Sequence, residues 1–523
     1  MNANSDGTGS GGVARGAIRG LMWVSTAVLV GSWLLTAIAQ LQSMSFVNHV
    51  SGAWIALSYW ASQGVYYPAL EFDGNFAGTR FGPLSIALQA LAYRLTGDAV
   101  VGGKLLHVGY MIGLVAGLWI LLRPLKLPAY LRVWLATAVL ATSIGWTAGL
   151  TIRHDAFATM LQVWALALLC YGGRVTYRGV VIAGVLAALA PLAKVSALWG
   201  VAACFLYLLA MNPKRLLLFL GVWFGTLVVG LGLVQWFSDG RFYENMRGCL
   251  FVSDGVVGGM SFDLLLQSGS HFWRALKVEP VLWLTLPLSV AGVWYGRRHT
   301  PHLAIACVMV WLMSAYLYTR SGIWPNHLID LVAICTVGTG MLLSKVGMPA
   351  GDGTGDARRG YGRACVFVLY ALVFAGFIFY VSPMSTHARW GKARLGHIRA
   401  SLEALVGMEV VPTARETVLT QLKPGERVVS LYPMVPVLLD QDPIVLDAWM
   451  LRVYFETHPD SEAAFIQRVE AKEFDAFVFG LGVGPELEES PWHFGQPTLD
   501  AIRRNYRLDD VGAYTVFRPI RDE

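Results

Sequence analysis

Eleven long apolar runs constrain the fold of this chain more than any other feature. They occupy residues 21–41, 100–122, 131–150, 155–172, 179–193, 195–211, 215–236, 280–296, 302–318, 326–344 and 364–382. A helix needs roughly 20 apolar residues to cross a bilayer. Only 14% of the 523 residues are charged, whereas a soluble protein carries about 25%. We therefore predict a polytopic α-helical membrane protein with about 11 transmembrane helices.

Two of these runs allow more than one interpretation. The first, 21–41, could be a signal peptide, because Ala37-Ile38-Ala39 resembles a cleavage site. Its apolar stretch is longer than the core of a usual signal peptide, so we interpret it as a retained first helix. The runs at 179–193 and 195–211 meet close to Pro191, which makes their boundary the hardest to place.

The distribution of basic residues predicts the orientation. If the N-terminus is cytoplasmic, every inner loop carries at least two basic residues, which is the positive-inside pattern. These residues are Arg15, Arg19, Arg123, Lys126, Arg132, Arg174, Arg178, Lys214, Arg215, Arg297, Arg298, Lys345, Arg358, Arg359 and Arg363. An odd number of spans then leaves the C-terminus outside. The compact loops and uncleaved start favour a bacterial inner membrane.

This topology divides the chain into three parts. Residues 1–20 are rich in Gly and Ser and are predicted to be a disordered cytoplasmic N-terminus. Residues 21–384 form the membrane domain, with long outer loops at 42–99 and 237–279. Residues 385–523 have the composition of a soluble extracytoplasmic domain. Four strands are expected there, in ERVVSLYPMVPVLLD, DPIVLDAW, FDAFVFG and GAYTVFRP, alternating with helical stretches such as SEAAFIQRVEAKEF, so we predict a small α/β fold.

Ionisable residues gather at the outer ends of the predicted spans. They are His49, Glu71, Asp73, Arg80, Arg153, His154, Asp155, Lys194, Asp239, Arg241, Glu244, Arg320, His327 and Asp330. Charges near a membrane are costly unless they are paired or used. Cations can hold a phosphate, and a carboxylate or histidine can take a proton from an attacking hydroxyl. The mixture suits a phosphate-bearing substrate.

Each of these residues also has a purely structural interpretation. Arg80 and Lys194 could extend toward lipid headgroups. Arg153 and Asp155 could form an ion pair that closes a loop, and His49 could be a satisfied polar residue. His327 and Asp330 are one helical turn apart and could hydrogen-bond each other. The residues alone therefore indicate where a site lies, without indicating a reaction.

Several motifs resemble one family. SGAWIALSYWASQGVYYP and GTRFGPLSIALQALAYRLTGD in the first outer loop are similar to a helix, a Gly-Leu-Tyr-Pro turn and an R-Y-x-P-L segment. RHDAFATMLQVWALAL, APLAKVSALWGVAACFLYLL and TRSGIWPNHLIDLVAI are similar to three further segments. The tail, with KPGERVVSLYP, FDAFVFG and NYRLDDVGAYTVFRP, is similar to an appended extracytoplasmic domain. Together they resemble the GT-C class of membrane glycosyltransferases, which includes protein O-mannosyltransferases and the aminoarabinose transferase of lipid A.

The resemblance implies a reaction and its partners. Enzymes of this class take a sugar from a polyprenyl-phosphate carrier in the bilayer and pass it, with inversion, to a glycan, lipid or protein acceptor at the outer face. Arg80, Arg153, Lys194 and Arg320 would bind the donor phosphate, and Tyr67, His327 and Asp330 would bind substrate. We predict no cofactor, no metal site and no nucleic-acid partner. A carboxylate-bound divalent cation stays open as an alternative.

The resemblance breaks at one position. The family places an acidic residue about fifteen residues before its Gly-Leu-Tyr turn, and counting back from Gly64 reaches His49. Asp73 and His49 are therefore equal candidates for the catalytic base, Glu71 ranks behind them, and Asp155 is expected to orient the base. Two alternatives stay open: a transporter or flippase for a lipid-linked precursor, and a non-catalytic scaffold. The apolar middles of the spans argue against a transporter, which needs polar groups there.

Overall fold

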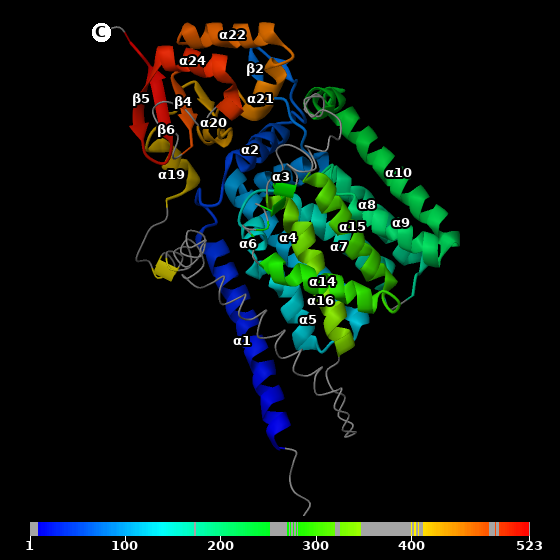
Figure 1. Ribbon diagram of the computed structural model, residues 1–523. Coiled ribbons are helices and arrows are strands. Elements are labelled where there is room, and N and C mark those ends of the chain that lie inside the picture. The colour runs from blue at the N-terminus through cyan, green and yellow to red at the C-terminus, as the bar shows by residue number, and fades with distance from the viewer. Residues whose placement is uncertain are drawn as a thin grey trace, which may run out of the picture.

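The fold is described here from a computed structural model (Figure 1). The structure describes residues 9–171, 174–251, 281–318, 325–346, 412–480 and 491–521, together with a few single positions between these ranges. The predicted run at 364–382 and the candidate Arg320 lie outside the described residues. We call residues 9–346 the membrane unit and residues 412–521 the C-terminal unit.

Helices lie at ten of the predicted apolar runs. The helices of the membrane unit are α1 (Gly9–Ala39), α4 (Ala99–Leu121), α5 (Ala129–Thr137), α6 (Ser143–Ala148), α7 (Asp155–Leu169), α8 (Tyr177–Ala193), α9 (Trp199–Met211), α10 (Pro213–Phe237), α14 (Val281–Gly296), α15 (Pro301–Leu317) and α16 (Ile329–Val346). Among the described residues, 4 helices, at Arg19–Ala39, Ala99–Leu125, Pro213–Phe237 and Asn326–Val346, are long and apolar enough to cross a membrane, and shorter apolar helices accompany them. The fold is thus a helical membrane protein, and the total number of spans stays a prediction.

Two expectations about this unit differ from the structure. The run at 131–150 is not one helix, because α5 passes into a 3-10 turn, η2 (Ala138–Ala141), and breaks at Thr142, which caps α6. The segment 1–20 is not wholly disordered, because α1 begins at Gly9. Extending an existing helix backwards adds one hydrogen bond for each residue that is ordered, which costs far less than starting a new helix.

Local sequence explains where helices end and how closely they pack. Asp98 begins α4 by accepting hydrogen bonds from the amides of Val100 and Val101 at 2.7 and 2.9 Å. Glycine allows α14 and α16 to touch, because a Cβ at Gly292 would collide with the carbonyl of Gly338. Small residues of this kind let membrane helices approach backbone to backbone.

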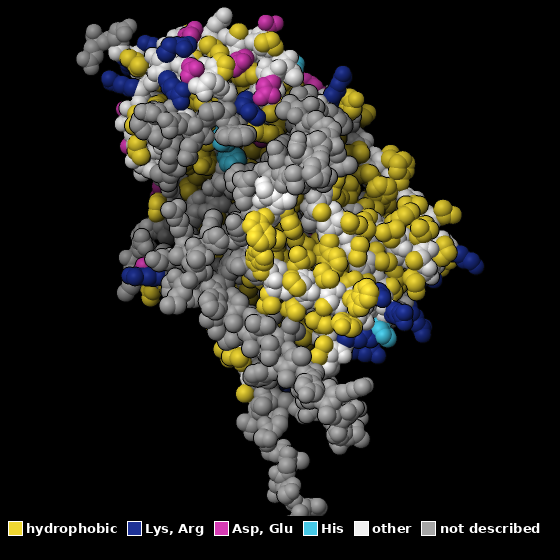
Figure 2. Space-filling model, viewed as in Figure 1, with side chains coloured by type: hydrophobic (Ala, Val, Ile, Leu, Met, Phe, Trp, Pro, Cys, Tyr) yellow, Lys and Arg dark blue, Asp and Glu magenta, His cyan; other side chains and the backbone are white. Residues whose placement is uncertain are grey.

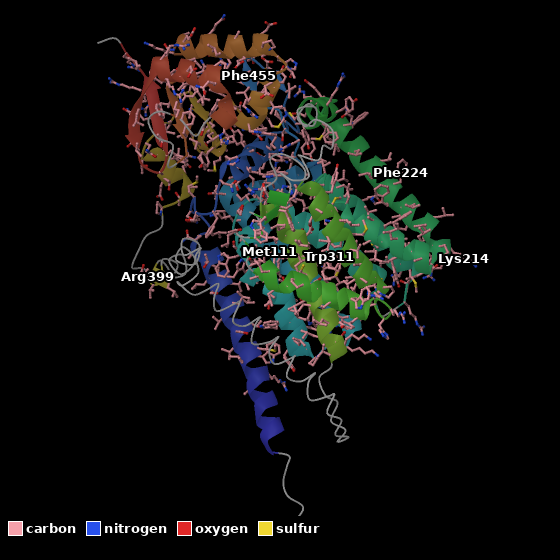
Figure 3. The ribbon with its side chains drawn as sticks, in the orientation of Figure 1. Met111, Lys214, Phe224, Trp311, Arg399 and Phe455 are labelled. Atoms are coloured by element: carbon pink, nitrogen blue, oxygen red, sulfur yellow. The ribbon has the colours of Figure 1, made fainter. Side chains whose placement is uncertain are left out.

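The exposed surface of the helices is apolar. Figure 3 places Phe224 on α10 and Lys214 at the end of that helix far from the C-terminal unit. Phe224 is 62% exposed and Trp236 80% exposed. Figure 2 shows hydrophobic side chains covering this flank, with Lys and Arg gathered at its lower end. A soluble monomer rarely exposes so large an apolar area, so this flank fits contact with lipid.

A layer of short elements joins the two units, and we call it the outer layer. It consists of α2 (His49–Ser62), β1 (Glu71–Phe72), β2 (Asn75–Phe76), α3 (Pro83–Thr96), α11 (Arg241–Met246) and the π-helical turn η4 (Arg247–Phe251). β1 and β2 form a two-stranded antiparallel hairpin. Asn245 ties α11 to the first outer loop, because its side chain accepts from the Thr79 amide and donates to the Pro68 carbonyl, at 2.9 and 3.0 Å.

The C-terminal unit combines a small sheet with helices. Its elements are α19 (Ala414–Leu419), β3 (Val428–Ser430), α20 (Met434–Leu438), α21 (Ala448–Phe455), α22 (Pro459–Glu470), β4 (Ala476–Phe479), α23 (Pro491–Phe494), α24 (Gln496–Asn505), β5 (Tyr506–Val511) and β6 (Thr515–Pro519). The strand order is β3-β4-β6-β5. β3 runs parallel to β4, with Val428 opposite Ala476, and the other pairs are antiparallel.

Two of the four strands expected in the tail correspond to β4 and β6. The expected strand ERVVSLYPMVPVLLD is right only over β3, because Met434–Leu438 within it forms the helix α20. The fourth, DPIVLDAW, is wrong as a strand of this sheet. Val445 instead makes an isolated parallel bridge to Phe76 of the outer layer, and the segment then enters α21. Its consecutive apolar residues, 443–446, are all buried, so this apolar run reflects burial and not sheet membership.

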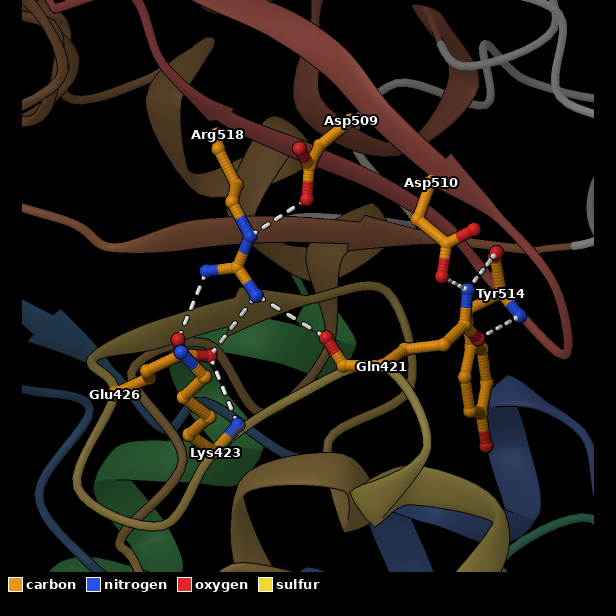
Figure 4. A network of polar contacts seen from close by, with 7 residues as sticks. All are labelled: Gln421, Lys423, Glu426, Asp509, Asp510, Tyr514 and Arg518. Atoms are coloured by element: carbon orange, nitrogen blue, oxygen red, sulfur yellow. Dashed lines mark hydrogen bonds and ion pairs between the residues drawn. The ribbon is translucent and has the colours of Figure 1, made fainter.

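Arg518 ties together three segments of this unit (Figure 4). Its guanidinium donates to Asp509 on β5 at 2.8 Å, to Glu426 at 2.9 Å and to the Gln421 carbonyl at 3.1 Å. Gln421 in turn donates to Asp510 at 2.8 Å and accepts from the Tyr514 amide at 2.8 Å. These bonds fasten the β5–β6 hairpin to the loop that leads into β3.

Candidate functional site

A charged cluster lies where α7 and α16 begin and α8 ends, on the side of the C-terminal unit. Asp155 is the first residue of α7, Lys194 directly follows α8, His327 lies in the 3-10 turn η5 (Pro325–Leu328), and Asp330 is the second residue of α16. The Lys194 ammonium forms an ion pair with Asp155 and lies 3.0 Å from Nδ1 of His327. Residues from three distant segments therefore meet at one point.

Asp330 is held by a separate set of donors. Its carboxylate accepts hydrogen bonds from Thr159 Oγ1 at 2.7 Å and from Trp199 Nε1 at 2.8 Å. Within the described residues, no hydrogen bond joins Asp330 to His327, so the local pairing considered from the sequence is wrong. Asp330 instead links the start of α16 to α7 and α9 through these two hydrogen bonds.

Arg153 lies near the cluster but is not part of its ion pair. It lies two residues before Asp155, yet the ion-pair partner of Asp155 in the described chain is Lys194. The buried Nε of Arg153 has no hydrogen-bond partner among the described residues. A buried N–H group without a hydrogen-bond partner is costly. The Nε donor of Arg153 is therefore available for an anion.

Arg80 reaches the same region from the first outer loop. Its backbone is well fixed, since Thr79 binds Asn245 and the buried Tyr67 hydroxyl donates to the carbonyl of Phe81 at 2.5 Å. The Arg80 guanidinium lies over the ring of Trp449, with its carbon 4.7 Å from the ring centre. It is also close enough to His327 to interact electrostatically. Tyr67, predicted to bind substrate, is here a support for the Arg80 segment.

His49 lies at the start of α2 and faces the C-terminal unit. Its ring is 5.6 Å from that of His493, in an edge-to-face arrangement. Burial, and then the positive charge of Arg153, lower the pKa of His49 to about 4. Burial and His49 likewise lower the pKa of His493 to about 4. Both rings are therefore neutral near pH 7 and can accept a proton.

The other two base candidates lie apart from the cluster. Glu71 accepts hydrogen bonds from the Tyr454 hydroxyl at 2.9 Å and from Ser461 Oγ at 3.1 Å, which links the hairpin to the C-terminal unit. Asp73 is exposed in the turn between β1 and β2, where its φ is 49°. These positions give Glu71 a structural partner and leave Asp73 in a turn. Their catalytic roles stay predictions.

Three residues beside the site had no role assigned from the sequence. His154 lies between Arg153 and Asp155, 4.2 Å from the ring of Trp54 and 4.7 Å from that of His107. The sequence did select His154 as one of the ionisable residues at the outer span ends. Trp449 and His493 carry no such local signal, because they reach the site only through the packing of the C-terminal unit. Within the described residues, no three His, Cys, Asp or Glu side chains gather as metal ligands.

The overall fold of the chain is similar to that of solved GT-C membrane glycosyltransferases. The chain is similar to ArnT from Cupriavidus metallidurans bound to undecaprenyl phosphate, with a TM-score of 0.57 and 12% identity over 96% of this chain and 98% of that one. The apo state of the same ArnT gives a TM-score of 0.51, with the same identity and coverage. Archaeal oligosaccharyltransferase AglB from Archaeoglobus fulgidus is similar at a TM-score of 0.48 and 13% identity, over 95% of this chain and 75% of that one.

Two further comparisons returned nothing: no protein-family model matches the chain, and no curated protein sequence matches it. At 12% identity the structural likeness establishes the fold alone. The expectation of a GT-C fold, drawn from short motifs, is confirmed.

Proposed function

We propose that the chain is a membrane glycosyltransferase that moves a sugar from a polyprenyl-phosphate carrier to an acceptor hydroxyl at the outer face of a bacterial inner membrane. One observation carries the proposal. Arg80 and Arg153 both lie within electrostatic range of His327 in the Lys194–Asp155–His327 cluster, while no hydrogen bond or ion pair within the described chain engages the guanidinium of Arg80 or Nε of Arg153. A fixed group of cations beside an apolar flank suits a phosphate attached to a lipid.

The orientation follows from charge and is part of the proposal. Lys and Arg gather at the end of the membrane unit opposite the C-terminal unit (Figure 2). If that end is cytoplasmic, as the positive-inside rule requires, the cluster and the C-terminal unit lie outside. The lipid carrier then reaches the cluster from the bilayer and the acceptor reaches it from the aqueous side.

The proposed chemistry is a single displacement. The acceptor oxygen attacks the anomeric carbon, the bond from that carbon to the phosphate oxygen breaks, and polyprenyl phosphate leaves as an anion. Arg80, Arg153 and Lys194, with Arg320 as a further candidate, stabilise the charge that develops on the leaving phosphate. His49 accepts the proton of the acceptor hydroxyl, because it is neutral and faces the same space. Attack opposite the leaving group inverts the anomeric carbon.

The test uses the full-length chain in lipid nanodiscs with polyprenyl-phosphate-linked hexoses and pentoses, and measures release of polyprenyl phosphate. His49→Gln should lower turnover by roughly 10²–10⁴-fold while donor binding persists. Arg153→Ala should weaken donor binding. Arg94→Ala is the control, since Arg94 is an exposed cation of the same outer layer that binds the Ser62 carbonyl at 3.0 Å.

The outcomes separate the alternatives. If no donor releases its phosphate and none binds, the glycosyltransferase proposal fails and a scaffold role replaces it. If the donor binds without losing its sugar, and crosses the bilayer when the protein is placed in sealed liposomes, the chain is a transporter for the lipid-linked precursor. Equal losses in Arg94→Ala and Arg153→Ala would contradict the assignment of the phosphate site.

A further inference from the structure

We infer that Trp449 of the C-terminal unit is a positioning residue for the phosphate site, because it orients the Arg80 guanidinium toward the charged cluster. The inference rests on the proposed function and assigns to the C-terminal unit a direct part in binding the lipid phosphate. The C-terminal unit would then be a component of the site, and not only a cover above it.

The placement of Trp449 begins with the bridge between the units. Phe76 pairs with Val445 in parallel: its amide donates to the Ile444 carbonyl and its carbonyl accepts from the Leu446 amide, both at 2.8 Å. Arg80 lies four residues beyond Phe76, and Trp449 lies four residues beyond Val445. Because the two segments run parallel from this bridge, residues four positions beyond it lie close together.

The backbone on both sides of this contact is held firmly. Asp447 caps α21, where its Oδ1 accepts from the amides of Trp449 and Met450, each at 3.1 Å. On the other side, Asn245 binds the Thr79 amide at 2.9 Å. The Asp447 carboxylate also interacts electrostatically with Arg80. The indole and the start of the arginine side chain are thus both fixed in space.

What is left free is the end of the Arg80 side chain. An arginine loses much rotational entropy when it is ordered, and within the described residues the ring of Trp449 is the contact that covers its guanidinium. Stacking uses the face of the guanidinium, whereas the five N–H donors lie in its plane. An aromatic face therefore orients the cation without using any of the donors that bind a phosphate.

Charged groups of both units lie within electrostatic range of Arg80. Arg80 interacts with Asp447 on the side of the C-terminal unit and with His327 on the side of the membrane unit. His327 contacts Lys194, which pairs with Asp155. Trp449 therefore holds Arg80 at the boundary between the two units, beside the cations expected to bind the same phosphate.

The experiment measures binding of undecaprenyl phosphate to the full-length protein in nanodiscs. Trp449→Leu should weaken binding roughly twofold to thirtyfold, the range of a cation–π contact from exposed to desolvated. Trp449→Phe, which keeps an aromatic face, should restore most of the affinity. In Arg80→Ala protein, adding Trp449→Leu should cause no further loss, because the two residues act as one unit. Trp449→Met gives the same comparison if Trp449→Leu does not fold.

Tyr454→Phe is the matched control, because it removes a different contact across the same joint, the hydrogen bond to Glu71. It should leave binding unchanged. Equal losses in Tyr454→Phe and Trp449→Leu, or a loss from Trp449→Leu that persists in Arg80→Ala protein, would overturn the inference and leave the proposed function intact. If the unsubstituted protein does not bind undecaprenyl phosphate, the proposed function fails, and the inference fails with it.

Discussion

At the scale of single residues, the proposed base is a histidine, His49, and not an acidic residue. Its ring is 5.6 Å from that of His493 on the C-terminal unit and lies within electrostatic range of Arg153. A carboxylate base is charged before it reacts, whereas a neutral histidine accepts a proton without a prior charge. Beside Arg153, a neutral base does not compete with the phosphate for the positive charge.

The pKa of His49 makes a prediction for the pH dependence of turnover. Because that pKa is lowered from 6.5 to about 4, the ring stays neutral from pH 8 down to about pH 5. Turnover should be flat over this interval and fall about tenfold for each unit below about pH 4. The measurement is initial rate against pH for the unsubstituted protein and for His49→Gln.

His458→Gln serves as the control for that profile, since His458 lies on the C-terminal unit at the start of α22. An acid limb with a midpoint close to pH 6.5 would show that His49 is not the group that titrates. The free energy of unfolding should change with pH in the same direction as turnover. Above about pH 6.5 the neutral buried ring contributes its full stabilisation, and this stabilisation is lost as the pH falls toward 4.

The sequence predicted part of this site and missed the rest for a clear reason. Asp155, Lys194 and His327 could be selected because each stands at the end of an apolar run, where a charge is costly unless it has a use. The actual pairing could not be selected, since Asp155 binds Lys194 and not its near neighbour Arg153. Trp449 follows a soluble-type segment, and only the bridge to Phe76 brings it to Arg80.

At the scale of elements, the β5–β6 hairpin depends on one arginine. Arg518 on β6 joins Asp509 on β5 to Glu426 before β3, and its side chain is 26% exposed. Charge-assisted bonds of this kind are stronger than those of a fully exposed pair. β5 is an edge strand of the sheet and pairs there with β6 alone, whereas β6 also pairs with β4.

Arg518→Met should therefore loosen the hairpin while the membrane unit stays intact. We expect a local destabilisation of about 1 to 2 kcal/mol, seen as faster hydrogen–deuterium exchange of β5 and β6 amides in the full-length protein. Arg507→Met is the control, because Arg507 lies directly opposite Arg518 on β5 and is exposed. Equal acceleration in the two variants would show that the network in Figure 4 does not hold the hairpin.

At the scale of the whole molecule, the charge distribution predicts that the two ends of the protein face opposite sides of the membrane. Lys214 lies at the end of α10 far from the C-terminal unit (Figure 3), and Asp460 lies on α22. Lys214→Cys should react with a membrane-impermeant maleimide only after the membrane is opened. Asp460→Cys should react from outside in intact spheroplasts.

The background for this measurement is low, because Cys170, Cys204, Cys249, Cys307 and Cys335 are buried. The unsubstituted protein provides the correction for any label at Cys365, which lies outside the described residues. Labelling of both substituted positions from the same side would contradict the proposed orientation and, with it, the outer location of the site.

The sequence by itself determined the helical membrane class, the positions of ten apolar runs that contain helices, and the strands β4 and β6 with part of the segment that forms β3. These properties depend on local sequence. A long apolar run is stable only in lipid or in a protein core, and the spacing between apolar residues indicates whether a segment forms a helix or a strand. Only the tertiary structure decided which charges meet, because that depends on how segments distant in the chain pack. The bridge from Phe76 to Val445 is the clearest case, since it carries the C-terminal unit onto the outer layer and sets Trp449 over Arg80.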